Sequence, residues 1–158
     1  MAKLVALVST LCILATFVHG HNQEIFNVEG DVYCDPCRVE FETQLSERLT
    51  GATVKLECRN RETSAVTYSV EGVTGINGHY SLKVEGDHEN DICDVTLLKS
   101  PREDCNEQME DLEKARVSCT KNTGITSHVR FANPIGFMTK YVNPKCAPVL
   151  FDLGFQLE

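Results

Sequence analysis

Apolar and polar residues alternate in several short runs, which is the pattern of half-buried β-strands. The first run places every second residue from Phe26 to Cys34 on one face. Turn residues separate the later runs: Asn77-Gly78 favours a positive φ, and Ser100-Pro101 ends an apolar run. Beyond the first run, alternation therefore predicts strands at residues 53–58, 66–70, 79–84 and 92–98.

The remaining segments have weaker patterns. Residues 39–49 permit either a helical turn or a loop, and residues 104–117 carry Met109 and Leu112 at helical spacing. For residues 104–117 a short helix and a structured loop are both open. Short strands are expected at 115–120, 128–132 and 133–137, followed by an apolar tail at 147–157. Together these runs predict an all-β fold, a small antiparallel β-barrel or sandwich of about seven strands with at most one short helix.

The first 20 residues have the features of a signal peptide. Lys3 precedes an apolar run of about 15 residues, and Val18-His19-Gly20 carries small or tolerated residues at a cleavage site. A membrane-spanning helix needs roughly 20 apolar residues, so the run is too short to be an anchor. We therefore expect residues 1–20 to be removed and residues 21–158 to form one secreted domain that is not held in a membrane.

The charge of the chain disfavours two classes of partner. The 158 residues include 15 basic and 23 acidic side chains, and the loss of Lys3 with the signal peptide leaves 14 basic residues and a net charge of −9. An acidic surface repels phosphate backbones and anionic lipid. Neither nucleic acid nor a membrane surface is therefore expected as a partner.

The cysteine count indicates an oxidising compartment. Cys12 lies in the predicted signal peptide, which leaves an odd number of cysteines in the secreted domain. Six of them are expected to pair, and one to stay free, buried or linked to another chain. Six cysteines allow 15 connectivities, so spacing alone does not choose among them. The seven are Cys34, Cys37, Cys58, Cys93, Cys105, Cys119 and Cys146.

Cys34 and Cys37 have the spacing of a redox pair, but a structural interpretation is favoured. A redox pair has its first cysteine at a helix N-terminus, whereas Cys34 ends a predicted strand. Zinc is disfavoured because no second Cys-x-x-Cys or Cys/His pair completes a tetrahedral set. Each of the two cysteines is therefore expected to form a separate long-range disulfide.

Other chemistries have weaker support. Cleavage after Gly20 would expose His21, whose amine and ring can chelate copper with one further histidine, although solvated histidines are the ordinary case. The acidic segment 87–91 lacks the spacing of a calcium-binding loop. No nucleophile motif or phosphate-binding glycine loop is present, so no catalytic residue, metal ligand or cofactor site is predicted. The three candidate copper partners are His79, His88 and His128.

The segment from Glu29 to Arg38 is similar to the signature of the olive major pollen allergen family, the Ole e I-like secreted plant proteins. Segments 51–59, 92–95, 99–101 and 133–137, followed by Cys146, resemble family positions in family order, so the resemblance covers about residues 28–146. The signature residues are Glu29, Gly30, Val32, Tyr33, Cys34, Asp35, Cys37 and Arg38.

This resemblance implies a disulfide-stapled β-barrel that is extracellular, occurs in pollen and is not an enzyme. It implies roles in hydration, germination or tube growth, IgE binding in several members, and a receptor-kinase ectodomain or another cell-surface or cell-wall protein as partner. Cys119 lies outside the six family cysteines. The implied disulfides are Cys34–Cys105, Cys37–Cys146 and Cys58–Cys93.

A small-molecule carrier is the alternative hypothesis. It requires the inward faces of several strands to enclose a cavity, whereas small barrels usually fill that space with side chains. An extracellular enzyme is a third hypothesis, without a supporting motif. The sequence leaves open the physiological partner, the oligomeric state and whether Cys119 is free or intermolecular. The faces that would line a carrier cavity belong to Val54, Leu56, Tyr68, Tyr80 and Leu82.

Overall fold

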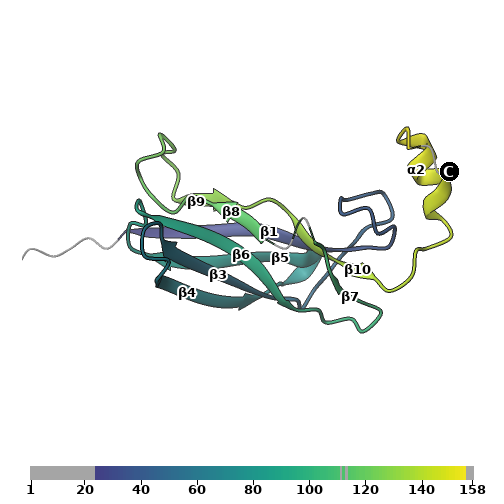
Figure 1. Ribbon diagram of the computed structural model, residues 1–158, viewed down its shortest axis with the longest axis horizontal. Helices are drawn as coiled ribbons and strands as arrows, with labels where there is room; N and C mark the ends of the chain where they lie inside the picture. The colour runs from purple at the N-terminus through teal and green to yellow at the C-terminus, as the bar shows by residue number, and fades with distance from the viewer. Residues whose placement is uncertain (1–23, 111, 113, 156–158) are drawn as a thin grey trace, which may run out of the picture.

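The computed structural model describes residues 24–110, 112 and 114–155 (Figure 1). The predicted signal peptide and His21 lie outside this part of the chain. Within it, no helix combines the length and the apolar character that crossing a membrane requires.

Strand β1 (Ile25–Asp35) is the centre of the first sheet. Its first half pairs antiparallel with β5 (His79–Glu85) and parallel with β9 (Val129–Phe131). Its second half pairs antiparallel with β2 (Glu47–Arg48) and parallel with β10 (Ile135–Thr139). β10 in turn pairs antiparallel with β7 (Cys105–Gln108). This sheet is therefore mixed, whereas the sequence had predicted antiparallel pairing throughout.

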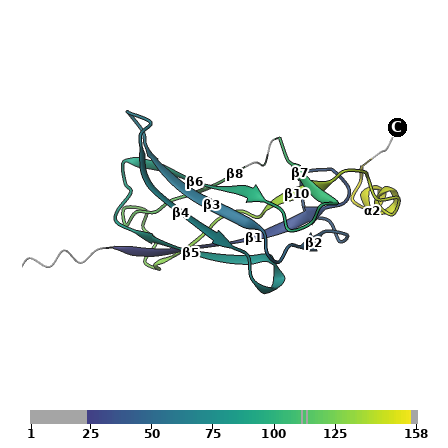
Figure 2. The same cartoon turned by 90° about the horizontal axis from the view of Figure 1, so that it is seen from below.

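The second sheet is antiparallel, with strand order β4-β3-β6-β8. Figure 2 shows β3, β4 and β6 in one layer, and β1 and β5 in the other. The predicted runs at 53–58, 66–70 and 92–98 all fall within this sheet. Its strands are β3 (Thr53–Asn60), β4 (Val66–Val73), β6 (Asp91–Lys99) and β8 (Lys114–Val117).

One hydrophobic core lies between the two sheets. Phe26 and Val28 of β1 and Leu82 of β5 belong to the same buried cluster as Leu56 of β3 and Val95 of β6. Burying an aliphatic or aromatic side chain of this size contributes about 1.5–3 kcal/mol. Two sheets packed face to face form a sandwich, so the sandwich alternative is confirmed and the closed barrel is not.

The faces proposed to enclose a carrier cavity contribute to this core instead. Val54, Leu56, Tyr80 and Leu82 are buried members of the central cluster, and Tyr68 packs against it. The inward side chains of the two sheets therefore contact one another across the sandwich.

Residues 104–117 contain no helix in the described part of the chain, so the helical alternative was wrong. They include β7 and β8 instead. Ala115 and Val117 alternate inward, and Met109 contacts Tyr33 across the fold rather than a residue one helical turn away. These residues form strands despite their helical spacing, because β7 pairs with β10 and β8 pairs with β6, which lie far away in sequence.

Three further expectations needed correction. Ten strands are present among the described residues rather than about seven. The expected strand 115–120 ends at Val117, so Cys119 follows β8 instead of belonging to it. The expected apolar tail contains α2 (Cys146–Asp152), a short helix that buries Val149 and Leu150.

The Asn77-Gly78 pair takes positive φ values of 61° and 69° within the 3-10 turn η2 (Ile76–Gly78). This confirms the predicted turn before β5. A Cβ atom on Gly78 would lie 2.4 Å from the Val32 carbonyl oxygen, so glycine is required there for space as well as for φ.

Candidate interaction site at the cysteine-linked end

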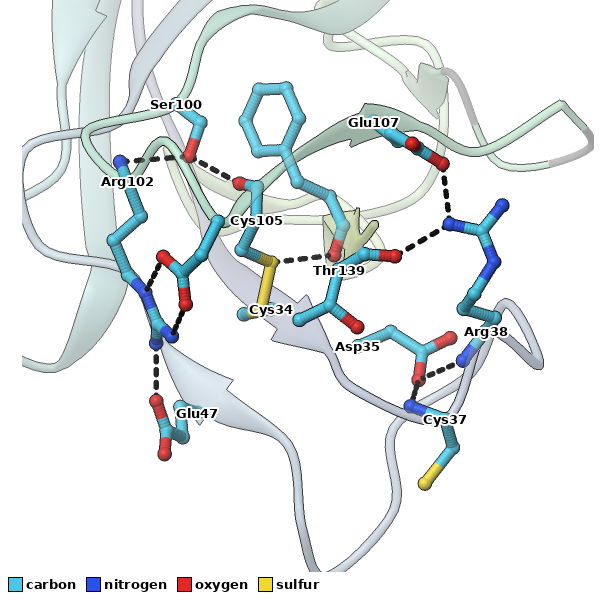
Figure 3. The surroundings of a disulfide bond; sticks show 12 residues. Cys34, Asp35, Cys37, Arg38, Glu47, Ser100, Arg102, Cys105, Glu107 and Thr139 are labelled. Atoms are coloured by element: carbon cyan, nitrogen blue, oxygen red, sulfur yellow. Dashed lines mark hydrogen bonds and ion pairs between the residues drawn. A yellow bond between two sulfur atoms is a disulfide. The ribbon is translucent and has the colours of Figure 1, made fainter. Parts of the chain in front are cut away.

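Two disulfides lie at the end of the sandwich where β1 finishes. We call residues 34–41, 102–108 and 139–155 the cysteine-linked end; it includes α2 (Figure 1). Cys34 in β1 is bonded to Cys105 at the start of β7, with a Cα–Cα distance of 6.1 Å (Figure 3). Cys37 is bonded to Cys146 at the start of α2, at 5.4 Å. These are the pairs that the family resemblance implies.

Asp35 organises the loop that joins the two disulfides. Its carboxylate is fully buried and accepts four backbone N–H groups. Oδ1 accepts from Cys37 at 2.8 Å and Arg38 at 3.0 Å, and Oδ2 accepts from Val39 at 2.7 Å and Glu40 at 2.9 Å. Arg38 and Glu40 have positive φ values of 56° and 60°, which cost free energy that these charge-assisted bonds offset.

Arg38 connects this loop to the first sheet. Its guanidinium forms an ion pair with Glu107 of β7 and donates to the Thr139 carbonyl oxygen of β10 at 2.5 Å (Figure 3). The family position Arg38 therefore fixes the loop against two strands, in addition to the disulfides.

Tyr33 packs beneath the loop with Met109 and Met138. Its hydroxyl donates to the Met109 sulfur at 3.8 Å. Burial, and after it the charge of Asp35, raises the pKa of Tyr33 to about 12, so this tyrosine is a neutral packing residue at physiological pH. A Cβ on Gly136 would lie 2.8 Å from the Tyr33 carbonyl oxygen, which explains the glycine opposite it.

Three signature positions lie earlier on β1. A Cβ on Gly30 would lie 2.4 Å from the Tyr80 hydroxyl oxygen, so the absent side chain leaves room for that ring. Val32 is fully buried in the core. Glu29 points outward, where its carboxylate lies 3.7 Å from His79 Nε2. The signature residues therefore serve packing and loop geometry rather than one chemical centre.

An open groove of about 630 Å³ runs beside this frame. Arg102 crosses it with ion pairs to Glu47 and Asp104, and the hydrogen bonds that its guanidinium donates to Asp104 and Glu47 raise its pKa (Figure 3). Tyr141 is 77% exposed and Val142 is also exposed on its wall. The groove is lined by Cys34, Pro36, Leu45, Glu47, Arg102, Glu103, Asp104 and residues 139–145.

Sequence reasoning missed this groove. Lys140 and Lys145 also line it, and neither has an ion-pair partner among the residues that the structure describes. The available signal was the segment Lys140-Tyr141-Val142, in which apolar side chains follow a strand without continuing its alternation.

The third disulfide joins Cys58 and Cys93, which lie directly opposite each other on β3 and β6. Two strands, β4 and β5, separate β3 from β6 along the chain, but β3 and β6 are neighbours in the sheet. Cys119 is a free cysteine and is 1% exposed.

The candidate copper ligands have separate partners. His79 Nδ1 lies 2.9 Å from Asp31, His88 Nδ1 lies 2.8 Å from Asp91, and the His128 ring lies beside Phe26. In the described part of the chain, one group of at least three potential ligands has the spacing of a metal site. It consists of Cys58, Cys93 and Cys119, of which the first two form a disulfide.

Comparison with known proteins identifies the family. The profile described as "Pollen protein Ole e 1 like" matches residues 24–154. The chain belongs to this family. It is 58% identical to "Anther-specific protein LAT52" of Solanum lycopersicum, over 100% of this chain and 99% of that protein. It is 48% identical to "Olee1-like protein" of Betula pendula, over 91% of this chain and 89% of that protein.

The fold of this Ole e 1-like chain also matches a solved structure. The crystal structure of the major plantain pollen allergen Pla l 1 aligns with a TM-score of 0.70 and 38% sequence identity. The alignment covers 77% of this chain and 99% of that one. The three disulfides of the Ole e 1-like chain fit an extracellular environment.

Proposed function

We propose that this Ole e 1-like chain is a secreted, non-catalytic pollen protein that acts by contact with another protein during hydration, germination or tube growth. The expected signal peptide and the three disulfides support secretion. The names of two relatives support an occurrence in pollen, since one is called anther-specific and another is the "Pollen-specific protein C13" of Zea mays. The proposed partner is a receptor-kinase ectodomain or another protein of the cell surface or cell wall.

The observation that carries this proposal is the groove with its exposed apolar wall. Tyr141 and Val142 lie in solvent on a segment that follows β10, while the disulfide of Cys37 and Cys146 holds the far end of the same segment. Aromatic side chains presented by a pre-ordered backbone are the usual anchors of protein interfaces, because little conformational entropy is lost on binding.

Two lysines of the groove are available to an acidic partner surface, although the formal charges that line the groove balance. Arg102 pairs with both Glu47 and Asp104, and Glu103 is a third carboxylate of the groove, whereas Lys140 and Lys145 have no ion-pair partner among the described residues. On a secreted domain with a net charge of −9, these two lysines are local contact points for carboxylates.

IgE binding is a second part of the proposal. Relatives at 44–45% identity are named as the pollen allergens Sal k 5.0101 of Kali turgidum and Che a 1 of Chenopodium album. A disulfide-linked β-sandwich keeps its surface ordered, which is the condition for antibodies raised against one member to recognise conformational epitopes on another.

The test is binding of the secreted protein to immobilised receptor-kinase ectodomains expressed in pollen. Replacement of Tyr141 by Ser should weaken a specific complex at least about tenfold, because a buried aromatic anchor contributes 2 kcal/mol or more. Lys140→Glu should weaken it and remove part of its salt dependence. Absence of binding to any ectodomain or cell-wall protein, with the fold intact, would contradict the proposal.

Ile125→Ser provides the matched control. Ile125 is also an exposed apolar residue, but it belongs to the segment between β8 and β9, which lies at the opposite end of the molecule from α2 (Figure 1). This variant should bind like the unaltered protein. Equal losses for Ile125→Ser and Tyr141→Ser would place the contact elsewhere.

A further inference from the structure

Three cysteine sulfurs meet in the core of the second sheet. The Sγ atoms of Cys58, Cys93 and Cys119 all lie within 4.8 Å of one another, and all three residues are buried. Two of the sulfurs form a disulfide and the third is a free thiol. A thiol beside a disulfide is the reactant pair of thiol–disulfide exchange, which proceeds by attack of a thiolate on one of the two bonded sulfurs.

The strand order indicates which sulfur is attacked. Cys93 on β6 pairs with Val117 on β8, and Cys119 follows two residues later and is buried in the same core cluster as Val117. Cys119 is therefore a diagonal neighbour of Cys93, and their Sγ atoms lie within 4.8 Å of each other. Cys58 lies on β3, one strand farther away.

We propose that Cys119 exchanges with the Cys58–Cys93 disulfide inside the folded protein, so that Cys93 becomes bonded to Cys119 and Cys58 becomes the free thiol. The Cys119 thiolate attacks Cys93 Sγ, and a new S–S bond forms. The old bond breaks, and Cys58 Sγ leaves with its electron pair as a thiolate, which takes up one proton in place of the one that Cys119 lost. No oxidant or reductant is consumed.

The surroundings of Cys119 make this exchange slow. Burial raises the pKa of the Cys119 thiol to about 11, and the guanidinium of Arg130 offsets this only in part. The thiolate that attacks is therefore about one part in 10⁴ at pH 7. His88 lies beside this region, since its backbone N–H donates to the Cys119 carbonyl oxygen at 2.9 Å, and its ring Nδ1 lies 2.8 Å from an Asp91 carboxylate oxygen.

The exchange moves a covalent link from inside the sheet to its border. In the starting form the disulfide joins β3 and β6, which already pair along their whole length. In the product it joins β6 to residues 118–120, which no strand ladder holds. A small cavity of about 200 Å³ touches both Cys93 and Cys119, and the charged side chains lining it are Arg61, His88, Glu89, Asp91 and Arg116.

Peptide mapping of the intact secreted protein tests the proposal. The protein is held at pH 7, 8, 9 and 10, quenched with acid, unfolded and alkylated without reduction, while circular dichroism follows the fold. Label should move from Cys119 to Cys58, with an initial rate that rises about tenfold per pH unit. Label that stays on Cys119 at pH 10 in folded protein, or moves to Cys93, would overturn the proposal.

Two matched variants test the reach of Cys119 independently. Cys58→Ser leaves Cys93 and Cys119 as thiols, and Cys93→Ser leaves Cys58 and Cys119. With oxidised glutathione, Cys58→Ser should close an internal Cys93–Cys119 bond at least about tenfold faster than Cys93→Ser closes Cys58–Cys119. Equal rates, or mixed glutathione disulfides without an internal bond in Cys58→Ser, would contradict the assignment. Cys119→Ser lacks the attacking thiol, so Cys58 and Cys93 should take up no label at any pH.

Discussion

The two ends of the sandwich fix irregular backbone by opposite means. At the cysteine-linked end, the anion Asp35 collects four N–H donors, and two disulfides close the loops around it. We call residues 61–65, 86–90 and 118–128 the loop end; there the buried cation Arg130 donates to the carbonyl oxygens of Ser118, Thr120, Ser127 and Val129.

This difference shows that one buried charge can replace a set of missing ladder bonds. Backbone N–H and C=O groups withdrawn from water need partners, and a loop presents both kinds. Asp35 satisfies donors and Arg130 satisfies acceptors, while Arg130 also stacks 4.8 Å from the Phe26 ring centre. The cysteine-linked end has covalent links in addition, so the two ends should respond differently to the loss of one residue.

The largest effect is expected from removal of a disulfide at the cysteine-linked end. The double variant Cys34→Ala/Cys105→Ala opens a link between residues 71 apart in sequence, and both cysteines are buried. Chain entropy for a loop of this length predicts a loss of about 4 kcal/mol in the free energy of unfolding. Urea denaturation measures it, and an unchanged midpoint would show that the bond does not stabilise the fold.

Asp35→Ala should come next, with a loss of about 3 kcal/mol. It leaves one buried and three part-buried N–H donors without their acceptor while both disulfides remain. Asp35→Asn is the matched control, since it keeps the shape and one acceptor oxygen and should lose less. Hydrogen exchange of the amides of residues 37–40 locates the effect. Equal stabilities for Asp35→Ala and the unaltered protein would assign the loop geometry to the disulfides alone.

Arg130→Met makes the corresponding change at the loop end. It preserves length and apolar contact with Phe26 but removes the donors to four carbonyl oxygens, so we expect a loss of about 2 kcal/mol. Residues 118–128 should exchange amide hydrogens faster, because no disulfide holds them. Arg130→Lys should restore part of the loss. Loss of protection confined to the cysteine-linked end would contradict this prediction.

Acid should weaken the loop end through Asp91. Burial alone would raise the pKa of Asp91, but hydrogen bonds from Thr67 and His88 and the charges of His88 and Arg61 lower it below 3.8 overall. A carboxyl group whose pKa is lower in the folded than in the unfolded state stabilises the folded protein at pH values above its unfolded-state pKa. This stabilisation is lost as the pH falls through the folded-state pKa. Stability should therefore fall as the pH drops below the ordinary pKa of an aspartate, about 3.9, and Asp91→Asn should reduce this fall. The free energy of unfolding is measured by urea denaturation at each pH. If it falls equally with pH in Asp91→Asn and in the unaltered protein, Asp91 is not the cause.

The smallest effect lies between the two ends. The buried hydroxyl of Tyr80 has no hydrogen-bond partner in the described part of the chain, so Tyr80→Phe should be neutral or stabilise by up to about 1 kcal/mol. Tyr33→Phe is the matched control, because the Tyr33 hydroxyl donates to Met109 and its removal should cost about 0.5 kcal/mol. The shifts in thermal midpoint relative to the unaltered protein should therefore differ between the two variants in sign or size. A destabilised Tyr80→Phe variant would show that the Tyr80 hydroxyl has a hydrogen-bond partner.

The sequence by itself determined most of the strands. Side chains alternate across a strand with period two, so the buried face of a strand can be predicted without information about the neighbouring strands. Phe26 and Val28 in β1 and Val54 and Leu56 in β3 are examples. The Asn77-Gly78 turn was equally predictable, since positive φ is a local preference. The signature residues could also be recognised in the sequence, but their roles in packing and in the loop geometry could not.

Only the tertiary structure decided the rest, because those features depend on residues far apart in sequence. Residues 104–117 had a helical pattern, yet pairing with β10 and β6 made β7 and β8 of them. The parallel pairing of β1 with β9 and β10 brings residues about 100 positions apart side by side. The two disulfides that hold the Asp35 loop against β7 and α2 join residues 71 and 109 positions apart.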